Sequence, residues 1–289
     1  MRGRKEIIMN SHTLISAHIT AYARFLLDEE RASATVEKYI RDIRSFASWL
    51  EGREVSKDTV VQWKSDLLAQ DKAPSTVNGK LSALNGLFGF LGWDDRKIKF
   101  LKLQKKVFRE TDRELTREEY RRLLETARCR YLNWLELLME TIYSTGIRVS
   151  EVRYITVEAV RAGRTDICLK GKIRTILLPG KLCRKLLKYA RKQKITSGQI
   201  FLSRDGTCLS RHQIWRAMKA LCAQAKVDPS KVFPHNLRHL FAVTFYQATH
   251  DIAKLADVLG HSSINTPRIY LLTTCLEHAR QLDLLGLVV

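Results

Sequence analysis

The feature that most constrains the fold lies within the first 92 residues. Four successive stretches there each have apolar residues that recur at steps of three and four positions. These patterns cover 11–30, 33–50, 56–68 and 74–91, and Gly52 and Gly92 follow the second and the fourth. Such spacing aligns apolar side chains along one stripe of each helix, and a short amphipathic helix has to bury that stripe against a neighbour. The sequence therefore predicts a compact four-helix domain over 1–93.

A change of pattern after residue 93 predicts a linker and a second domain. Periodicity fades over 94–112, where seven residues are lysine or arginine. This basic linker suits a solvated tether and a segment that follows a phosphate backbone equally well. Over 113–289, helical patterns surround two strand-like runs, 165–169 and 174–178, which we expect to form a hairpin. The predicted fold class is mainly α with a small β-sheet (α+β), a helical N-terminal domain preceding a mixed α/β domain.

The charge balance predicts a polyanionic partner. The chain holds 50 basic and 30 acidic residues, a net charge of +20, and 30 of the basic but only 15 of the acidic residues fall within 113–289. Between residues 161 and 194 there are twelve basic residues and one acid, Asp166. So uneven a distribution favours a surface that contacts a phosphate backbone, and nucleic acid is the expected polyanion.

Several protein classes are excluded by what the sequence lacks. No apolar run approaches the ~18 residues of a membrane span, and the basic start has no long apolar core of a signal peptide. Six scattered cysteines form no pair at metal-ligand spacing. We therefore expect a cytoplasmic, nucleoid-associated protein with reduced thiols, no membrane contact and no bound metal.

Short motifs in the second domain carry side chains suited to phosphate chemistry. A phenolate is a competent nucleophile toward phosphorus, and a guanidinium can bind two phosphate oxygens with parallel bonds. The stretch 147–151 is expected to begin a helix, on which a glutamate one turn after an arginine can hold its guanidinium. The residues are Arg148 and Glu151 in Thr-Gly-Ile-Arg-Val-Ser-Glu, His235 and Arg238 in Pro-His-Asn-Leu-Arg-His, His261 after Leu-Gly, and Tyr270.

In type, order and spacing these residues resemble the signature of the tyrosine recombinases, the phage-integrase family of site-specific DNA recombinases. The resemblance covers nearly the whole chain. It implies that 1–93 is a helical core-binding domain, that 94–112 is a basic linker and that 113–289 is the catalytic domain. It also implies that DNA is cut and rejoined through a 3′-phosphotyrosyl intermediate and a Holliday junction, with no cofactor.

The resemblance implies a role for each matching residue. Tyr270 is the nucleophile, Arg148 and Arg238 neutralise the non-bridging oxygens of the scissile phosphate, and Glu151 supports Arg148 from behind. His235 is implied to be the general base or proton relay. Pro267 departs from the family, which commonly has a hydroxyl residue three positions before the nucleophile.

Two further groups of the implied site come from the hairpin and from the motif after it. Family members carry a catalytic lysine in such a hairpin, as the general acid for the leaving 5′ oxygen. Here Lys170 matches better because glycine follows it, and Lys172 is the alternative. His261 is implied to donate a further hydrogen bond to the phosphate.

The tail over 275–289 has leucines and alanine at helical steps and is expected to dock on a neighbouring subunit. The resemblance implies a homo-tetramer assembled on two DNA sites through this tail, with an accessory DNA-binding factor as an open possibility. We expect a mobile-element recombinase that performs DNA integration, excision or transposition. The alternatives are a chromosome-dimer-resolving recombinase, a type IB topoisomerase and a catalytically inactive DNA-binding regulator.

Overall fold

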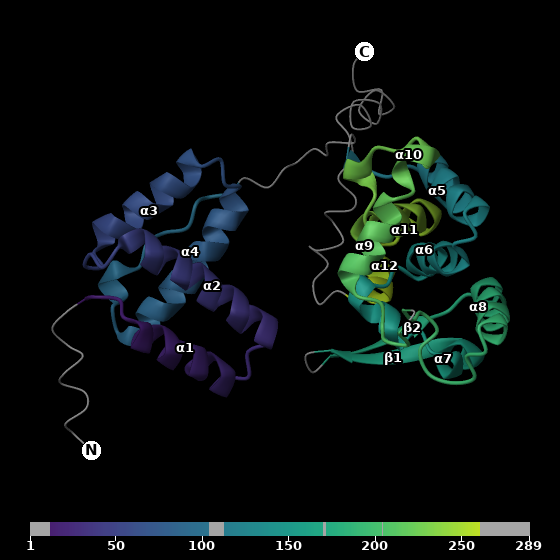
Figure 1. Ribbon diagram of the computed structural model, residues 1–289, viewed down its shortest axis with the longest axis horizontal. Coiled ribbons are helices and arrows are strands. Elements are labelled where there is room, and N and C mark those ends of the chain that lie inside the picture. The colour runs from purple at the N-terminus through teal and green to yellow at the C-terminus, as the bar shows by residue number, and fades with distance from the viewer. Residues whose placement is uncertain (1–11, 104–112, 170–171, 204, 261–289) are drawn as a thin grey trace, which may run out of the picture. The chain divides into compact units, whose positions relative to one another are not determined.

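The computed structural model describes residues 12–103, 113–169, 172–203 and 205–260 (Figure 1). The chain divides into two compact units, Met1–Lys105 and Lys106–Val289, and their boundary falls inside the predicted linker. Helices predominate in both units, while strands β1 (Arg164–Leu169) and β2 (Lys172–Leu177) form a two-stranded antiparallel sheet in the second. The predicted fold class, mainly α with a small β-sheet, is confirmed.

The first unit contains the four helices that the apolar periodicity predicts. Their stripes meet in one core, where Phe46, Trp63 and Phe88 are buried and the ring centroids of Phe46 and Trp63 lie 5.1 Å apart. Burial of aromatic side chains supplies much of the apolar area that so small a bundle can remove from water. The helices are α1 (Ser16–Asp28), α2 (Ser33–Leu50), α3 (Lys57–Ala69) and α4 (Pro74–Leu91).

The segment after α4 is fastened to the first unit by two asparagines of that helix. A 3-10 helix, η1 (Asp94–Arg96), is followed by a stretch without regular secondary structure over 97–103. Asn85 donates to the carbonyl of Ile98 at 2.9 Å and accepts from its N–H at 3.2 Å, and Asn78 makes the same pair of bonds with Leu101 at 2.9 and 2.8 Å. This part of the predicted linker therefore packs on the first unit and is not a solvated tether.

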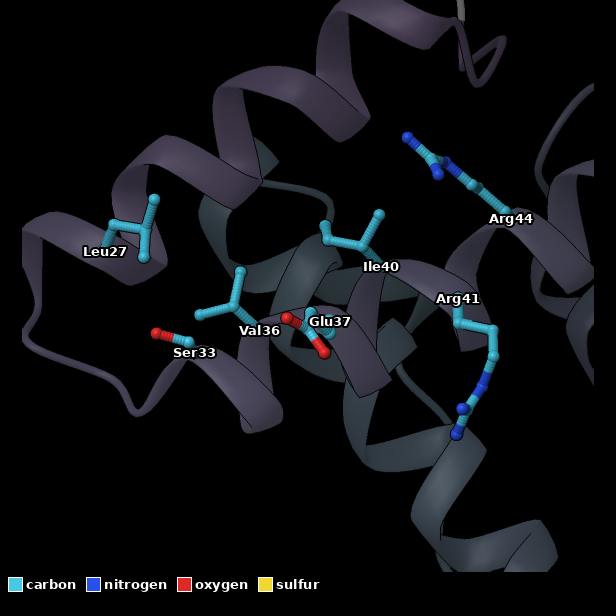
Figure 2. Close-up of a pocket in the computed structure, with 7 residues that line it drawn as sticks. All are labelled: Leu27, Ser33, Val36, Glu37, Ile40, Arg41 and Arg44. Atoms are coloured by element: carbon cyan, nitrogen blue, oxygen red, sulfur yellow. The ribbon is translucent and has the colours of Figure 1, made fainter. Parts of the chain in front are cut away.

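Between α1 and α2 lies a groove of about 560 Å³, whose apolar lining residues are Leu27, Val36 and Ile40 (Figure 2). Arg41 and Arg44 of α2 line it and are exposed to solvent. They add to the positive surface that the composition predicts for a nucleic-acid partner.

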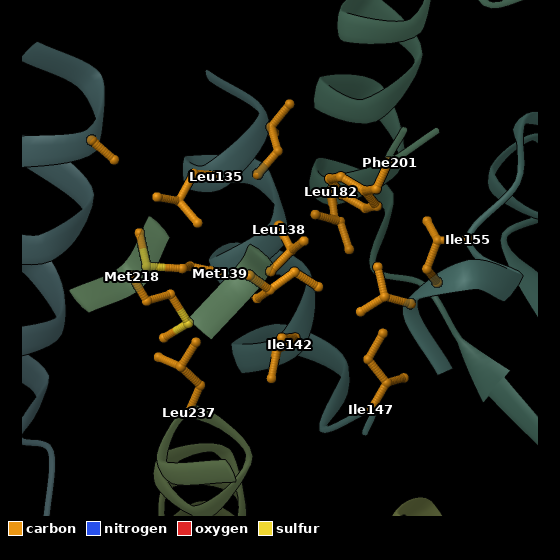
Figure 3. Close-up of a cluster of buried hydrophobic side chains, with 14 of the residues drawn as sticks. Leu135, Leu138, Met139, Ile142, Ile147, Ile155, Leu182, Phe201, Met218 and Leu237 are labelled. Carbon is orange, nitrogen blue, oxygen red and sulfur yellow. The ribbon is translucent and has the colours of Figure 1, made fainter. Parts of the chain in front are cut away.

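The second unit is built around one apolar helix, α6 (Asn133–Thr145). Its residues Leu135, Leu138, Met139 and Ile142 are fully buried (Figure 3). It packs against helices on several sides, and these carry the cleft described below. The other helices are α5 (Arg117–Cys129), α7 (Val157–Ala162), α8 (Gly180–Lys192), α9 (Arg211–Lys219), α10 (Cys222–Ala225), α11 (Pro234–Thr249) and α12 (Ile252–Leu259), with 3-10 helices η3 (Val149–Tyr154) and η4 (Pro229–Lys231).

The stretch expected to begin an α-helix at 147–151 forms the 3-10 helix η3 instead. The carboxylate of Glu151 accepts a hydrogen bond from the backbone N–H of Arg148 at 2.8 Å, the bond from the third residue of η3 to its N-cap residue. Thr156 then accepts from the N–H of Ala159 and caps a separate helix, α7. Ile155, with φ −81 and ψ 86, leaves the helical region, so η3 ends there and α7 begins separately at the Thr156 cap.

The hairpin confirms the predicted pair of strands. In its register Arg174 lies opposite Ile167 and Leu169 lies opposite Lys172. Residues two apart on a strand share a face, so Arg174 and Ile176 of β2 face the same way. Ile176 and Ile167 are buried in the core, which means that Arg174 also points toward the interior of the unit.

Candidate active site

A cleft of about 1040 Å³ opens in the second unit where η3, α9 and α11 meet. Among the described residues that line it there is no aspartate or glutamate, and the cations come from segments up to about ninety positions apart. A concave site with this charge attracts an anion such as a phosphodiester. The basic lining residues are Arg148, Arg153, Arg211, Arg238, His212 and His235.

Arg148 is held at the wall of this cleft by a buried carboxylate. Glu151 is 1 % exposed, and its two oxygens accept from the Arg148 guanidinium and from the Arg148 backbone N–H, each at 2.8 Å. The Arg148 side chain is nevertheless 42 % exposed. The arrangement leaves part of the guanidinium facing solvent while its direction is fixed from behind.

Arg174 is a second cation on the same carboxylate, and the sequence motifs did not indicate it. Its Nη1 lies 3.3 and 3.0 Å from the two oxygens of Glu151, and its Nη2 donates to the carbonyl of Val258 at 2.8 Å. Burial lowers the pKa of Arg174 and Glu151 partly offsets this, but a guanidinium stays protonated at any ordinary pH. The carboxylate is therefore shared between two positive groups.

Arg238 is buried, with 2 % of the residue exposed, and connects three helices of the unit. From α11 it donates to the carbonyl of Gly146, just after α6, and to the carbonyl of Leu259 at the end of α12, the latter at 2.9 Å. Both acceptors are helix C-terminal carbonyls, which otherwise lack partners and carry partial negative charge. Arg238 thereby ties the ends of α6 and α12 to the floor of the cleft.

His235 lies in the first turn of α11 and projects into the same cleft. Its pKa is below the ordinary histidine value because desolvation at the cleft wall, and then the positive charges of Arg238, Arg148 and Arg211, disfavour the imidazolium. The helix start is fixed by Asn236, which donates to two backbone carbonyls at 2.8 and 2.7 Å. The imidazole is therefore biased toward its neutral form, which is able to accept a proton.

The structure brings three of the predicted site residues together in the cleft, namely Arg148, His235 and Arg238, with Glu151 directly behind Arg148. Lys172 begins β2, and only its backbone is described. The catalytic roles of Arg148, His235 and Arg238 stay predictions. The predicted residues Lys170, His261 and Tyr270, and the tail 275–289, lie outside the described residues.

Sequence reasoning missed other side chains at the cleft and behind it. Arg153 and Arg211 line the cleft beside Trp215, and Arg174 lies behind Arg148. The only sequence signal for Arg211 was its place after a helix-capping serine within a basic chain. Such a signal indicates a helix start and says nothing of which cleft the side chain faces.

Metal-ligating side chains do not gather anywhere in the described part of the chain. Within 12–103, 113–169, 172–203 and 205–260 there is no group of three or more of them. Over the same ranges no helix has both the length and the apolar composition that a membrane crossing requires.

Comparison with known families and curated proteins matches both units. The description "Phage integrase family" matches residues 113–274, and "Phage integrase, N-terminal SAM-like domain" matches residues 19–95. Tyrosine recombinase XerC of Roseiflexus castenholzii is 31% identical over 284 residues, 89% of this chain and 88% of its own length. Tyrosine recombinase XerA of Pyrococcus furiosus is 26% identical over 280 residues, 94% and 95% of the two chains.

Solved structures agree in fold. A lambda integrase tetramer bound to a Holliday junction superposes with a TM-score of 0.73 at 19% identity, over 92% of this chain and 80% of that one. The XerH site-specific recombinase bound to its difH substrate gives 0.67 at 19% identity, over 92% and 84%. With one family description covering more than half of the sequence and a curated relative at 31% identity, the chain belongs to the phage integrase family, the tyrosine recombinases, which are DNA strand-exchange enzymes.

Proposed function

We propose that this protein recombines two specific DNA sites by forming a 3′-phosphotyrosyl bond at Tyr270. The observation that carries the proposal is the convergence of Arg148, His235 and Arg238 on one cationic cleft. Transition-state charge on a phosphodiester is best stabilised by donors that are already oriented, and here Glu151 orients one of them.

In the proposed step the phenolic oxygen of Tyr270 attacks the scissile phosphorus and the 5′ oxygen of the next nucleotide leaves. His235, biased toward its neutral form, takes the phenolic proton. Lys170, with Lys172 as the alternative, gives a proton to the leaving oxygen. Resealing reverses these transfers, and no cofactor is needed because one ester replaces another.

The guanidiniums of Arg148 and Arg238 neutralise the non-bridging oxygens of the scissile phosphate in this proposal. His261 adds a further donor. Since the chemistry is carried by side chains alone, we expect cleavage to proceed in the presence of a chelator.

The proposed partner is double-stranded DNA, gripped by both units. The net charge of +20 and the exposed Arg41 and Arg44 support a contact with the phosphate backbone. One structural neighbour is a lambda integrase tetramer bound to a Holliday junction, which supports assembly of four copies on two sites. We propose that the tail 275–289 joins the copies, and purified protein on its own tests whether an accessory factor is needed.

For the biological role we propose the chromosome-dimer-resolving alternative in preference to the mobile-element role expected from the sequence. The curated relatives named XerC, XerA and XerD support this choice, and two of them match this chain and their own length over about nine tenths. The Tn1549 transposon integrase, with a TM-score of 0.67, is 14% identical, against 31% for the XerC relative, so it gives less support to the mobile-element role.

The first experiment tests the nucleophile. Sites recovered by binding genomic fragments are made into nicked suicide duplexes, and wild type and Tyr270→Phe are incubated with them in chelator. We expect a covalent protein–DNA adduct on a denaturing gel with wild type and none with Tyr270→Phe. Bound sites that give no adduct would favour the inactive DNA-binding regulator.

The second experiment separates the remaining enzyme functions. A plasmid with two directly repeated sites, incubated with the protein, is expected to yield two smaller circles. Relaxation of supercoils without exchanged strands would instead identify a topoisomerase. Disruption of the gene in its host is expected to leave unresolved chromosome dimers, whereas a mobile-element recombinase would leave chromosome segregation unchanged and abolish excision of the element.

A further inference from the structure

Arg174 joins three segments that are far apart in the sequence. It projects inward from β2, and its side chain is 11 % exposed. It reaches Glu151 in η3 and the carbonyl of Val258 in the last turn of α12. One guanidinium thus connects the hairpin to Glu151, which supports Arg148, and to the end of α12, the helix before His261.

The charges around Glu151 do not cancel. Arg148 and Glu151 alone would form a neutral pair, and the Arg148 guanidinium would then have less attraction for an incoming phosphate. With Arg174 on the same carboxylate, the cluster carries one net positive charge. Because Glu151 is 1 % exposed and Arg148 is 42 % exposed, the part of this cluster that solvent or DNA can reach is the Arg148 guanidinium.

The contact of Arg174 with α12 depends on the absence of a side chain at residue 260. Gly260 has φ +62, and a Cβ there would lie 2.8 Å from Arg174 Nε and 3.1 Å from its Cγ. Arg174 therefore passes directly over the glycine that ends α12. Arg238 holds the neighbouring carbonyl, that of Leu259, so that the half-buried Arg174 and the buried Arg238 hold the last two residues of α12.

A packing role alone accounts poorly for a guanidinium at this place. Within the described residues the buried Nε–H of Arg174 has no hydrogen-bond partner. Desolvating such a group is unfavourable, and apolar replacements of buried ion pairs are often neutral or stabilising. Stability alone therefore does not explain a guanidinium at this position.

We propose that Arg174 is a positioning residue for strand cleavage, which sets the direction and the available positive charge of Arg148 through the shared carboxylate of Glu151. It does not touch the DNA. This inference rests on the proposed function, because it assigns Arg174 an effect on the same phosphodiester chemistry.

The test measures single-turnover cleavage of suicide duplexes at saturating protein, DNA affinity and melting temperature for Arg174→Gln and Arg174→Lys. We expect Arg174→Gln to cleave about thirtyfold more slowly than wild type, with DNA affinity changed by less than about threefold. Arg174→Lys keeps the charge but not the fork of donors, so we expect about a threefold loss. Should Arg174→Gln fail to fold, a lysine variant that cleaves at the wild-type rate, or about thirtyfold more slowly than wild type, overturns the inference.

A double-mutant cycle shows whether Arg174 acts through Arg148. We expect Arg148→Gln to lose about a hundredfold or more in rate, and Arg148→Gln with either substitution at 174 to be no slower than Arg148→Gln alone. Arg121→Gln is the charge-matched control, since Arg121 is an exposed residue of α5 that pairs with the exposed Glu118. We expect it to cleave at the wild-type rate.

Three outcomes would overturn the inference: a wild-type rate for Arg174→Gln, a lysine variant as slow as the glutamine variant, or losses at 148 and 174 that multiply. The proposed function fails in a different way. If wild type forms no adduct, or Arg148→Gln cleaves normally, the phosphate chemistry itself is wrongly assigned, whatever Arg174 does.

Discussion

Arg238 donates to the carbonyl of Leu259 at 2.9 Å, so that a residue in the second turn of α11 caps the last residue of α12. The same side chain donates to Gly146 after α6. A group proposed to bind the scissile phosphate is therefore also the group that fixes two helix ends at the floor of the cleft. On the proposed role, we expect substitution of Arg238 to change both DNA cleavage and local stability.

Gly146 offers a cleaner way to disturb this junction than Arg238 itself. Its φ is +64, and a Cβ would lie 2.6 Å from Phe241 Cε1 and 2.9 Å from Leu259 Cδ2. Alanine must then both adopt a left-handed backbone and displace two packed side chains. We expect Gly146→Ala to lower the free energy of unfolding by about 3 kcal/mol, measured by urea denaturation.

Gly163 supplies the matched control, because its φ is +69 and nothing lies within 4 Å of a Cβ built there. Gly163→Ala carries the backbone penalty alone, which we expect to be about 1 kcal/mol. Equal losses for the two variants would mean that the packing of Phe241 and Leu259 against Gly146 is unimportant.

Local sequence patterns predict where most helices lie, but they do not predict the contacts between side chains in the interior. Apolar steps located the four helices of the first unit and α6, α9 and α12 of the second, but not α7 or α10. The side chain of Thr116 caps α5 as its spacing with Glu119 indicates. Arg174, in contrast, meets partners 23 and 84 positions away, and one acceptor of Arg238 is 92 positions away. Periodicity carries no information on such contacts. The convergence of Arg148 with His235 was foreseen only through the family resemblance.

The depressed pKa of His235 predicts the acid limb of the cleavage rate. If neutral His235 takes the proton of the phenol, the rate stays level as the pH falls to the ordinary histidine value near 6.5 and declines only below it. Arg211 is one of the charges that lower this pKa, so Arg211→Gln is expected to move the midpoint to higher pH. Single-turnover rates from pH 5 to 8 give the midpoint.

The lowered pKa of His235 also determines the direction in which pH changes the folding stability. The unfolded chain binds a proton at His235 near pH 6.5 while the folded chain does not, so His235 lowers folding stability as the pH falls through that value. His235→Gln is expected to abolish this contribution. In the rate measurements, a midpoint of the acid limb for Arg211→Gln at or below that of wild type would contradict the assignment of the lowered His235 pKa to the neighbouring positive charges.

Glu151→Gln is expected to act in opposite directions on DNA binding and on cleavage. Removing the carboxylate raises the positive charge behind the cleft, so that affinity for DNA stays level or increases at low salt. The amide cannot accept from Arg148 and Arg174 as the carboxylate does, and we expect a cleavage rate about a hundredfold lower. Filter binding and suicide-duplex cleavage measure the two effects separately.

Glu136→Gln is the control for loss of a buried carboxylate. Glu136 is 9 % exposed and accepts two hydrogen bonds from Arg128, at 3.1 and 2.7 Å, on residues that do not line the cleft. We expect it to lose stability while cleaving at the wild-type rate per folded molecule. A parallel loss of affinity and rate in Glu151→Gln would point to general unfolding of the cleft.

The two bonds between Asn85 and the backbone of Ile98 predict ordered structure in the basic segment after α4. Asn85→Ala leaves the N–H and the carbonyl of the buried Ile98 without their partner, and we expect the first unit to lose about 2 kcal/mol. Hydrogen exchange measured by mass spectrometry on the full chain is expected to show faster exchange over 97–103, because side chains of α4 hold this stretch in place.

Asn85→Asp separates the two bonds, since a carboxylate still accepts from the Ile98 N–H but cannot donate to its carbonyl. Its exchange rates over 97–103 are expected to lie between those of wild type and Asn85→Ala. Asn78→Ala provides a comparison for exchange rates over 97–103, because Asn78 makes the same pair of bonds with the backbone of Leu101, three residues after Ile98. If Asn85→Ala exchanges at the wild-type rate, the contacts of Ile98 in the apolar core suffice to hold this segment, and the asparagine bonds contribute little.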